Sequence, residues 1–378
     1  MKKNVMKKVA IVGAGNAACI SALSLYLKKK ILESEIDEIE IYHDPSVPIS
    51  RVGQGTIPPL TLTISQVLGV DYFNNKIKAT AKNGILYENW GKNTPQHFHP
   101  FLMHAPAIHY SPNLLSKAVL ESGLFKVTDA NITDPESQID ADMIFDCRGW
   151  DKENKDSYRK LINPLNSVIL WDKKGRDPDI LWTKCVATPN GWTFVIPNVD
   201  SVSYGYLYNK DITSKEDAEK NFIDMFDAEP DGYLRFENYI AKNMFVGDRT
   251  VLNGNRLAFI EPLEATSTSF YQTVCGASWY GFVNDDKEYY NDIIQSEIEK
   301  IQNFIMWHYS KGSIYDTPFW NYAQNLSKGT FDRDEEFMDI MVSAGQSMSE
   351  KDMMVRWDDP RKYSQFNYSV IKNWHLVS

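Results

Sequence analysis

The chain has 378 residues, long enough for one large domain or two smaller ones that each bury a core. Hydrophobic residues make up 43% of it and charged residues 24%, as in an ordinary globular protein. Forty basic residues against 50 acidic ones give a net charge of −10, which argues against binding to nucleic acid or to an anionic membrane.

The first predicted elements are a strand, a tight turn and a helix in KKVAIVGAGNAACISALSLYLKKK. This stretch and its basic start could pass for a signal peptide. However, Gly13 and Gly15 break the apolar run early and no cleavage region follows. No other segment approaches the length of a transmembrane span. We therefore expect a soluble, cytoplasmic protein.

The turn of this opening unit has the spacing G-x-G-x-x-A. The first glycine permits the turn, the second lets a pyrophosphate approach the backbone, and the third small residue lets the helix pack on the strand. Amides at the start of the helix then face the phosphates. The predicted dinucleotide site comprises Gly13, Ala14, Gly15, Asn16, Ala17 and Ala18.

The second predicted strand, EIEIYHD, is expected to end at the residue that binds the ribose. His43 stands at the expected position and Asp44 follows it. Either side chain could meet the ribose, and the carboxylate of Asp44 is slightly favoured.

Further strands are predicted in residues 141–150 and 256–262, and with those near residues 10 and 40 they would form the nucleotide-domain sheet. GWTFVIPNVDSVSYGYLYN alternates apolar and small residues, which indicates an antiparallel sheet. After residue 285 the pattern becomes helical. The apolar face of this helix comprises Ile294, Ile298, Ile301 and Ile305.

These elements predict an α/β fold, in which a Rossmann-like module carries an antiparallel-sheet insert and a helical C-terminal part. The nucleotide-binding module is assigned to residues 1–60, 105–150 and 240–285. The substrate-binding and helical part is assigned to residues 61–104, 151–239 and 286–378.

The four cysteines are scattered and form no CxxC pair, so we expect buried, reduced thiols. The histidine spacings match no common ligand pattern, and we expect no metal site.

The stretch FIEPLEATSTSF places Glu261 and Glu264 three positions apart, and five small residues follow. One interpretation is a solvated turn whose carboxylate interacts with a helix dipole. The other is a catalytic acid beside a loop whose lightly covered amides bind an anion.

Seven stretches, in this order, resemble the flavin-dependent halogenases of the tryptophan-halogenase type over nearly the whole chain. They are VGAGNAA, RVGQGTIPPL, ATAKNGILYENWG, DADMIFDCRGW, GWTFVIP, FIEPLEATS and YDTPFW. Any one match is weak, whereas seven in the family's order are specific. The resemblance implies an FAD-binding module of the glutathione-reductase type. It also implies that the flavin is contacted by a strap, residues Gln54, Gly55, Thr56 and Ile57, and by Asn255.

The resemblance also implies the catalytic groups. Lys82 corresponds to the family's catalytic lysine, and Glu264 to the acid that takes the proton released by the aromatic ring. The backbone amides of Thr266 and Ser267 correspond to the halide site. By its local sequence alone, Lys82 would be a solvated surface lysine.

Trp192 and Phe194 correspond to a pair of aromatic residues near the flavin, which is thought to keep the enzyme from acting as an ordinary monooxygenase. Both residues could equally be core residues of a sheet. The late YDTPFW is expected to pack helices together.

For cofactors and partners, the resemblance implies reduced FAD from a separate flavin reductase, O2, a halide ion (chloride, bromide or iodide), and hypohalous acid as the oxidant. The substrate would be a small electron-rich aromatic molecule, and a homo-oligomer is compatible with the sequence. Two alternatives stay open: a flavin monooxygenase that uses no halide, and a non-catalytic flavin-binding homologue.

The chain departs from the family at several positions and is shorter than many members. The departures are Gln54-Gly55, Arg148, Phe194, Asn255 and Ser267. They leave flavin chemistry in place and make the substrate the open question. Because a shorter chain has fewer residues to build a closed amino-acid pocket, we expect a substrate other than free tryptophan.

Overall fold

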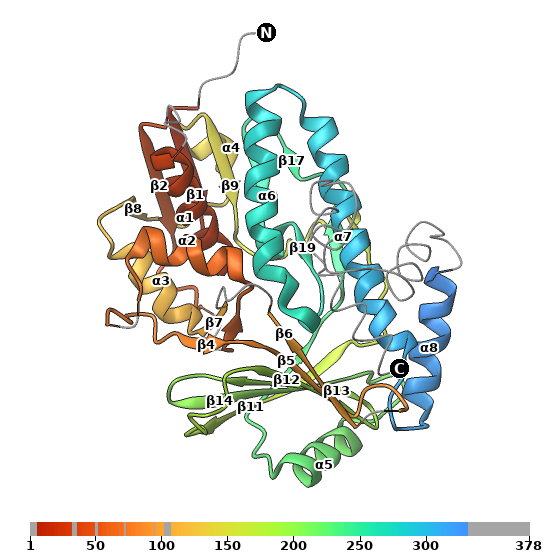
Figure 1. Ribbon diagram of the computed structural model, residues 1–378. Coiled ribbons are helices and arrows are strands. Elements are labelled where there is room, and N and C mark those ends of the chain that lie inside the picture. Colours follow the sequence, from red (N-terminus) through yellow and green to blue (C-terminus); the bar gives the residue numbers. More distant parts are fainter. Residues whose placement is uncertain are drawn as a thin grey trace, which may run out of the picture. The chain divides into compact units, whose positions relative to one another are not determined.

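The structure is a computed structural model that describes residues 6–31, 36–49, 52–71, 73–93, 95–101 and 107–331. The chain forms two compact units, each assembled from three separate stretches (Figure 1). Unit 1 contains the described residues up to Lys82, those within 103–161, and Asn238–Ser296. Unit 2 contains the described residues within 83–102, Ile162–Glu237, and those from Glu297 onward.

Unit 1 is built around a six-stranded sheet of order β17-β18-β9-β1-β2-β8, parallel except for β17. Its strands are β17 (Phe245–Val246), β18 (Thr250–Leu252), β9 (Met143–Asp146), β1 (Lys8–Val12), β2 (Glu38–His43) and β8 (Lys126–Asp129).

The central strand β1 is apolar on both faces because both faces are covered. Ala10 and Val12 belong to one core cluster with Ile144 of β9 and with residues of the segment before β9. Helix α1 (Asn16–Ile31) follows the tight turn and packs against α2, α3 and α6. This arrangement confirms the predicted Rossmann-like opening.

One predicted strand is wrong. Residues 256–262 were expected in the nucleotide-domain sheet, but β19 (Ala258–Phe259) lies in a separate sheet of order β10-β16-β19. The strand that extends the main sheet is β18, which precedes the Asn253-Gly254 turn. The apolar composition of both runs is similar, and composition does not tell which one pairs with β9.

The other elements of unit 1 are short strands and helices. They are β3 (Gln54–Gly55), β4 (Thr80–Lys82), β7 (Ala107–Tyr110), β10 (Tyr158–Lys160), β16 (Tyr239–Ala241), α2 (Pro58–Leu68), α3 (Pro112–Leu120), α4 (Pro135–Gln138) and α6 (Thr266–Val283). Residues 61–82 belong to unit 1, whereas the sequence assigned them to the second part. The reason is that β4 pairs with β7, which also pairs with β3.

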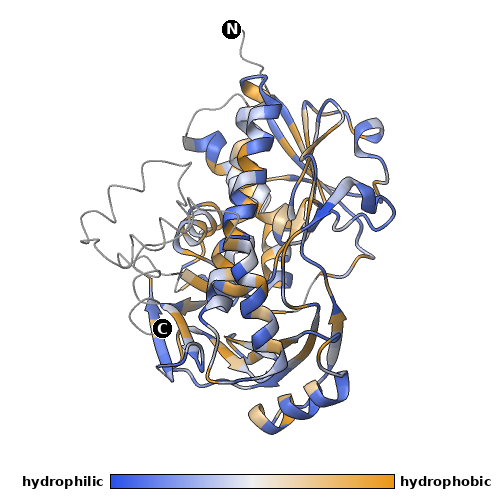
Figure 2. Cartoon of the chain, turned by 90° about the vertical axis from the view of Figure 1, so that its right-hand side faces the viewer, coloured by the Kyte–Doolittle hydropathy of each residue, from blue (hydrophilic) through white to orange (hydrophobic). Residues whose placement is uncertain are grey.

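Unit 2 is built around a seven-stranded sheet of order β15-β11-β14-β13-β12-β5-β6, antiparallel except for the pair β12–β5. Its strands are β15 (Gly232–Arg235), β11 (Ser167–Lys174), β14 (Ser201–Tyr208), β13 (Gly191–Pro197), β12 (Thr183–Thr188), β5 (Gly84–Glu88) and β6 (Gln96–Pro100). The predicted antiparallel sheet is thus present. One face of it packs on α5 (Lys215–Phe226), the helix at the foot of Figure 2, which carries both hydrophilic and hydrophobic residues.

The helical C-terminal part consists of α7 (Lys287–Ser310) and α8 (Pro318–Phe331). The four isoleucines predicted to form one face of α7 are all buried. The late YDTPFW packs the start of α8 on the β12–β13 turn. Thr317 Oγ1 donates to the carbonyl of Pro189 at 2.7 Å, and Trp320 Nε1 donates to that of Thr188 at 2.8 Å. None of the described helices is long and apolar enough to span a membrane.

Glu297 of α7 is a buried acid, 6% exposed, and desolvation raises its pKa from the ordinary value of 4.5. Its Oε1 has no hydrogen-bond partner in the described part of the chain. The folded state therefore binds a proton here more readily than the unfolded state, and stability falls as pH rises above the ordinary pKa of a glutamate.

We expect Glu297→Gln to raise the melting temperature at pH 8 and to change it little near pH 4. Exposed Glu288 of the same helix is the control, since Glu288→Gln should show no such pH dependence. Equal shifts at both pH values would contradict the prediction.

Candidate active site

The loop between β1 and α1 has the geometry of a phosphate cradle. Gly13 has φ +117°, and a Cβ there would lie 3.1 Å from the carbonyl oxygen of Cys147, so only glycine fits. At Gly15 a Cβ would meet nothing within 4 Å, so the described protein leaves this space open. Asn16 Oδ1, at the first residue of α1, is buried without a partner among the described residues. An open cradle and an orphaned polar atom at a helix start fit the pyrophosphate of a dinucleotide such as FAD.

A second turn, Asn253-Gly254, packs against helix α1. Gly254 has φ +63°, and a Cβ there would lie 2.4 Å from the Cβ of Ala17. Asn253 Nδ2 donates to Ser21 Oγ at 2.9 Å, which ties the turn to α1. This places Asn255 next to the loop, where its Oδ1 accepts from the hydroxyl of Tyr271 at 3.3 Å. The structure therefore brings together the loop and Asn255, which the sequence predicted to contact the same cofactor.

His43 and Asp44 lie at the end of β2, where the carbonyl of Tyr42 accepts a hydrogen bond from the amide of Gly13 at 2.8 Å. His43 Nε2 lies 3.0 Å from the carboxylate of Asp129. Asp44 accepts from the amide and hydroxyl of Ser46, which lowers the pKa of its carboxyl. Both residues thus lie close to the loop, and both remain candidates for the ribose.

Lys82 is fully buried, with 0% of its surface exposed, at the end of β4. In the small sheet of order β3-β7-β4, Gly55 pairs with His109 and Lys82 with Ala107. Strand β7 therefore lies between β4 and the strap strand β3, and the Lys82 side chain reaches across it to the strap. Lys82 Nζ donates to the carbonyl of Thr56 at 3.2 Å. The expectation that its local sequence alone suggests, a solvated surface lysine, is therefore wrong.

Gly55 leaves space for the Lys82 ammonium. This role of Gly55 was not predicted from the sequence. A Cβ at Gly55 would lie 3.0 Å from Lys82 Nζ, a tight contact that a larger side chain would worsen. The sequence does show that Gly55 replaces the usual Ala of the strap. This replacement can be interpreted only once it is known that β3 and β4 both pair with β7, because that pairing brings Gly55 and Lys82 together.

The turn before α6 has unusual backbone geometry. Glu264 (φ 67°) and Ala265 (φ 54°) are consecutive non-glycine residues in the left-handed region, an arrangement that costs energy and occurs at functional sites. These two residues turn the chain into the first turn of α6. Glu264 is half-buried, whereas Glu261 is fully buried, in keeping with a structural role for Glu261.

Thr266 and Ser267 are the first two residues of α6. Their amides are among the four N–H groups that a helix start leaves without an intrahelical partner. Thr266 is 6% exposed, and its Oγ1 has no hydrogen-bond partner within the described residues. The amides of a helix start, its positive end and an orphaned hydroxyl together fit a small anion.

Contacts connect this helix start to the lysine. Thr268 Oγ1 donates to the carbonyl of Gly55 at 3.4 Å, and the adjacent carbonyl of Thr56 accepts from Lys82. The first turn of α6, the strap and the buried ammonium thus form one connected cluster in unit 1.

Trp192 and Phe194 lie on one face of β13 in unit 2. Trp192 is fully buried, and its Nε1 donates to the hydroxyl of Tyr309 at 3.0 Å. Its ring lies 6.4 Å from that of Trp90, in a cluster that also contains Trp320. These are the contacts of core residues. The pair therefore has a structural role in the sheet, whether or not it also lies near a flavin.

Arg148, which replaces a small residue of the family, holds a buried carboxylate. Its Nε and Nη2 donate to the two oxygens of Asp146 at 2.8 and 2.7 Å, and its Nη1 donates to the carbonyls of Ile132 and Thr133. Arg256 Nε donates to the same Asp146 at 3.1 Å. This network fixes the end of β9 next to Cys147, whose carbonyl faces Gly13.

The three cysteines other than Cys147 are buried. Burial raises the pKa of the Cys19 and Cys275 thiols to about 12, so both are protonated and act as small hydrophobic residues. In the part of the chain that the structure describes, no group of three His, Cys, Asp or Glu side chains could hold a metal ion.

The Rossmann-like module and the connected cluster around Lys82 define a flavoprotein-like architecture, and comparisons give the family. The family model described as tryptophan halogenase matches residues 8–113 and 116–360. Tryptophan 7-halogenase RebH of Lentzea aerocolonigenes is 22% identical over 430 residues, covering 84% of this chain and 79% of that protein.

Solved structures share the fold. A flavin-dependent halogenase from Xanthomonas campestris has a TM-score of 0.75 at 16% identity, covering 99% of this chain and 94% of that one. BrvH, a flavin-dependent halogenase from Brevundimonas sp. BAL3, has a TM-score of 0.74 at 16% identity, covering 98% of this chain and 97% of that one. The chain belongs to the tryptophan halogenase family, whose members are flavin-dependent enzymes.

Proposed function

We propose that this protein halogenates a small electron-rich aromatic substrate, with Lys82 delivering the oxidised halogen. The observation that carries the proposal is the complete burial of Lys82, because lysine is almost never fully buried without a specific reason. When bound, reduced FAD would activate O2 and so supply the oxidising power that turns halide into hypohalous acid. The flavin is delivered by a separate reductase.

The residues of unit 1 have separate tasks in this proposal. The amides of Thr266 and Ser267, with the orphaned hydroxyl of Thr266, hold the halide ion. The ammonium of Lys82 donates three hydrogen bonds and holds hypohalous acid, or its desolvated amine forms an adduct with it. Glu264 takes the proton that leaves the ring when aromaticity is restored.

Glu264→Gln is expected to lower the halogenation rate on the order of 10²-fold, the low end for one general acid/base group. FAD binding should not change, because the carboxylate lies outside the phosphate cradle. The measurement is product formation with saturating halide, together with a flavin titration.

The matched control is Glu216→Gln, since Glu216 lies in the first turn of α5 and Glu264 lies directly before the first turn of α6, so both carboxylates are close to a helix start. If Glu264 only interacts with the helix dipole, both variants should lose a few tenths of a kcal/mol of stability, up to about 1, and no activity. That result would remove Glu264 from the proposal.

The substrate is proposed to be an aromatic molecule other than free tryptophan, because the chain departs from the family at Phe194, Asn255 and Ser267. A panel of indoles, phenols and anilines with L-tryptophan, reduced FAD and chloride, bromide or iodide, read by mass spectrometry, tests this. With bromide, halogenated products appear as isotope doublets. Turnover of free L-tryptophan well above that of the simple indoles and phenols would refute the substrate proposal.

The same panel distinguishes the alternative functions. A flavin monooxygenase on this fold would add oxygen to the substrate whether or not bromide is present. A non-catalytic flavin-binding protein would bind FAD and form no product. The consecutive left-handed residues before α6 favour a working site, because such strain is retained where function requires it.

A further inference from the structure

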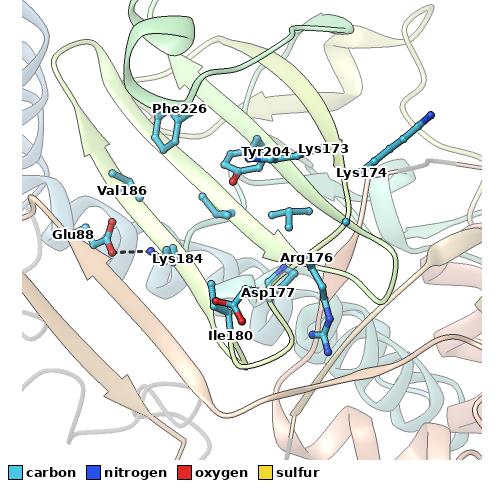
Figure 3. Close-up of a pocket in the computed structure, with 14 residues that line it drawn as sticks. Glu88, Lys173, Lys174, Arg176, Asp177, Ile180, Lys184, Val186, Tyr204 and Phe226 are labelled. Atoms are coloured by element: carbon cyan, nitrogen blue, oxygen red, sulfur yellow. Dashed lines mark hydrogen bonds and ion pairs between the residues drawn. The ribbon is translucent and has the colours of Figure 1, made fainter.

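Unit 2 contains a cavity of about 420 Å³ that the proposed reaction does not use (Figure 3). Its floor is made by Val186 of β12, Val195 of β13 and Val202 of β14. Side chains alternate along a strand, so Val195 lies on the opposite face of β13 from Trp192 and Phe194. The cavity is therefore on the α5 face of the seven-stranded sheet, whereas the Lys82 cluster belongs to unit 1.

The cavity exists because α5 covers only part of this face. Trp171 and Tyr206 of the sheet pack with Phe222 of α5 in one core cluster. Phe226, the last residue of α5, lies with its ring 5.8 Å from that of Tyr204, and both rings line the cavity. Beyond Phe226 the sheet face is open up to the loop after β11, which carries Arg176 and Asp177 (Figure 3).

The rim of the cavity has an excess of positive charge, although the whole chain has a net charge of −10. Lys173, Lys174 and Arg176 line it, and none of them has an ion-pair partner among the described residues. Lys184 is neutralised by Glu88 at 3.0 Å, which leaves Asp177 as the one unpaired acid among the lining residues. Lys174 points away from Asp177, so Lys173 and Arg176 are the cations that the cavity can use (Figure 3). Arg176 Nη1 is buried and has no acceptor in the described part of the chain. The Arg176 guanidinium therefore keeps hydrogen-bonding capacity that no described residue uses, and a guanidinium is suited to bind anionic oxygens.

We propose that this cavity binds small organic carboxylates that have a flat apolar body. The body lies on the valine floor beside Tyr204 and Phe226, and the carboxylate lies at the rim near Arg176 and Lys173. The volume is within the usual range for small-molecule sites, and an apolar lining with few polar groups is typical of them. The planar guanidinium of Arg176 can bind both carboxylate oxygens.

The test uses 4-benzoylbenzoate, an aromatic carboxylate with two planar rings that crosslinks on illumination, and its neutral amide as the matched ligand. We expect the wild-type protein to bind the carboxylate at least about 10-fold more tightly than the amide. Raising the salt from about 0.05 to about 0.5 M should weaken binding of the carboxylate and leave the amide unchanged, because salt screens the exposed rim charges. Crosslinked peptides should come from residues 171–204 or from the peptide that contains Phe226.

The variant is the double substitution Lys173→Gln with Arg176→Gln, which should reduce the affinity for the carboxylate at least about 10-fold and leave that for the amide unchanged. The control is Lys155→Gln with Arg235→Gln. Lys155 lies 5.6 Å from the ring of Trp150, just as Lys173 lies 5.6 Å from that of Trp171, and Arg235 is exposed on β15 outside the cavity.

Three results would overturn the proposal: equal affinity for carboxylate and amide, crosslinks confined to unit 1, or an equal loss of affinity in the control variant. Because 4-benzoylbenzoate could also enter the substrate site of unit 1, the positions of the crosslinks separate the two sites. Failure of halogenation would leave these binding results unchanged.

Discussion

Lys82→Ala is expected to abolish halogenation while the protein still binds FAD and still consumes O2 with reduced FAD. The lysine lies in β4, outside the phosphate cradle of β1 and α1, so removal of its amine leaves the flavin loop intact. Under the proposed function, the variant loses the group that would hold the oxidised halogen. The residual rate should fall below a tenth of the wild-type rate, and each factor of ten corresponds to about 1.4 kcal/mol of transition-state stabilisation.

Because Lys82 is fully buried, the alanine variant also leaves a cavity, which can cost about 2–5 kcal/mol of stability. Lys82→Met fills most of the same volume and removes only the ammonium. Both variants should lose halogenation, and the methionine variant should keep a melting temperature closer to that of the wild type. Lys242→Met, at an exposed lysine of unit 1, is the control and should keep full activity.

If Lys82→Met folds and retains more than about a tenth of the wild-type halogenation, the lysine contributes less than about 1.4 kcal/mol to the reaction. Lys82 would then be buried for the structure alone, as a donor to the strap carbonyl of Thr56. That result would favour the alternative function, a flavin monooxygenase that uses no halide.

The sequence predicted the parts of the fold that depend on local patterns. The β1–turn–α1 opening follows from β-branched residues ending at a glycine, and the buried face of α7 follows from four isoleucines at helical spacing. The order of the strands in the main sheet could not be predicted from the sequence. Strands β18 and β19 have similar composition, and only long-range pairing places β18 next to β9.

The candidate site shows the same limit. The loop residues were identified from their spacing, and their role in binding a dinucleotide stays a prediction. The burial of Lys82 was not predictable from TAKNG, a polar sequence typical of a surface turn. It depends on β7, which pairs with both β4 and β3 and so places the lysine next to Gly55. Contacts between strands far apart in the sequence determine this part of the site.

Gly15→Val is expected to abolish FAD binding without unfolding the protein. In the described protein, a Cβ at Gly15 meets no atom within 4 Å, so the added side chain should be tolerated by the fold. It occupies the space through which a pyrophosphate approaches the backbone, and the amides of the helix start can no longer reach the phosphates. The measurement is a titration with FAD, with circular dichroism and thermal melting to show that the variant is folded.

Two other glycines make the result specific. Gly329→Val adds a side chain in α8 where a Cβ meets no atom of the described residues within 4 Å, and it should bind FAD like the wild type. Gly13→Val should instead unfold or destabilise the protein, because Gly13 has φ +117° and a Cβ there would press on the carbonyl of Cys147. Loss of FAD binding in a folded Gly15→Val protein therefore reports on the cradle itself. Normal FAD titration by that variant would show that the pyrophosphate does not pass Gly15, and the open space at the start of α1 would need another explanation.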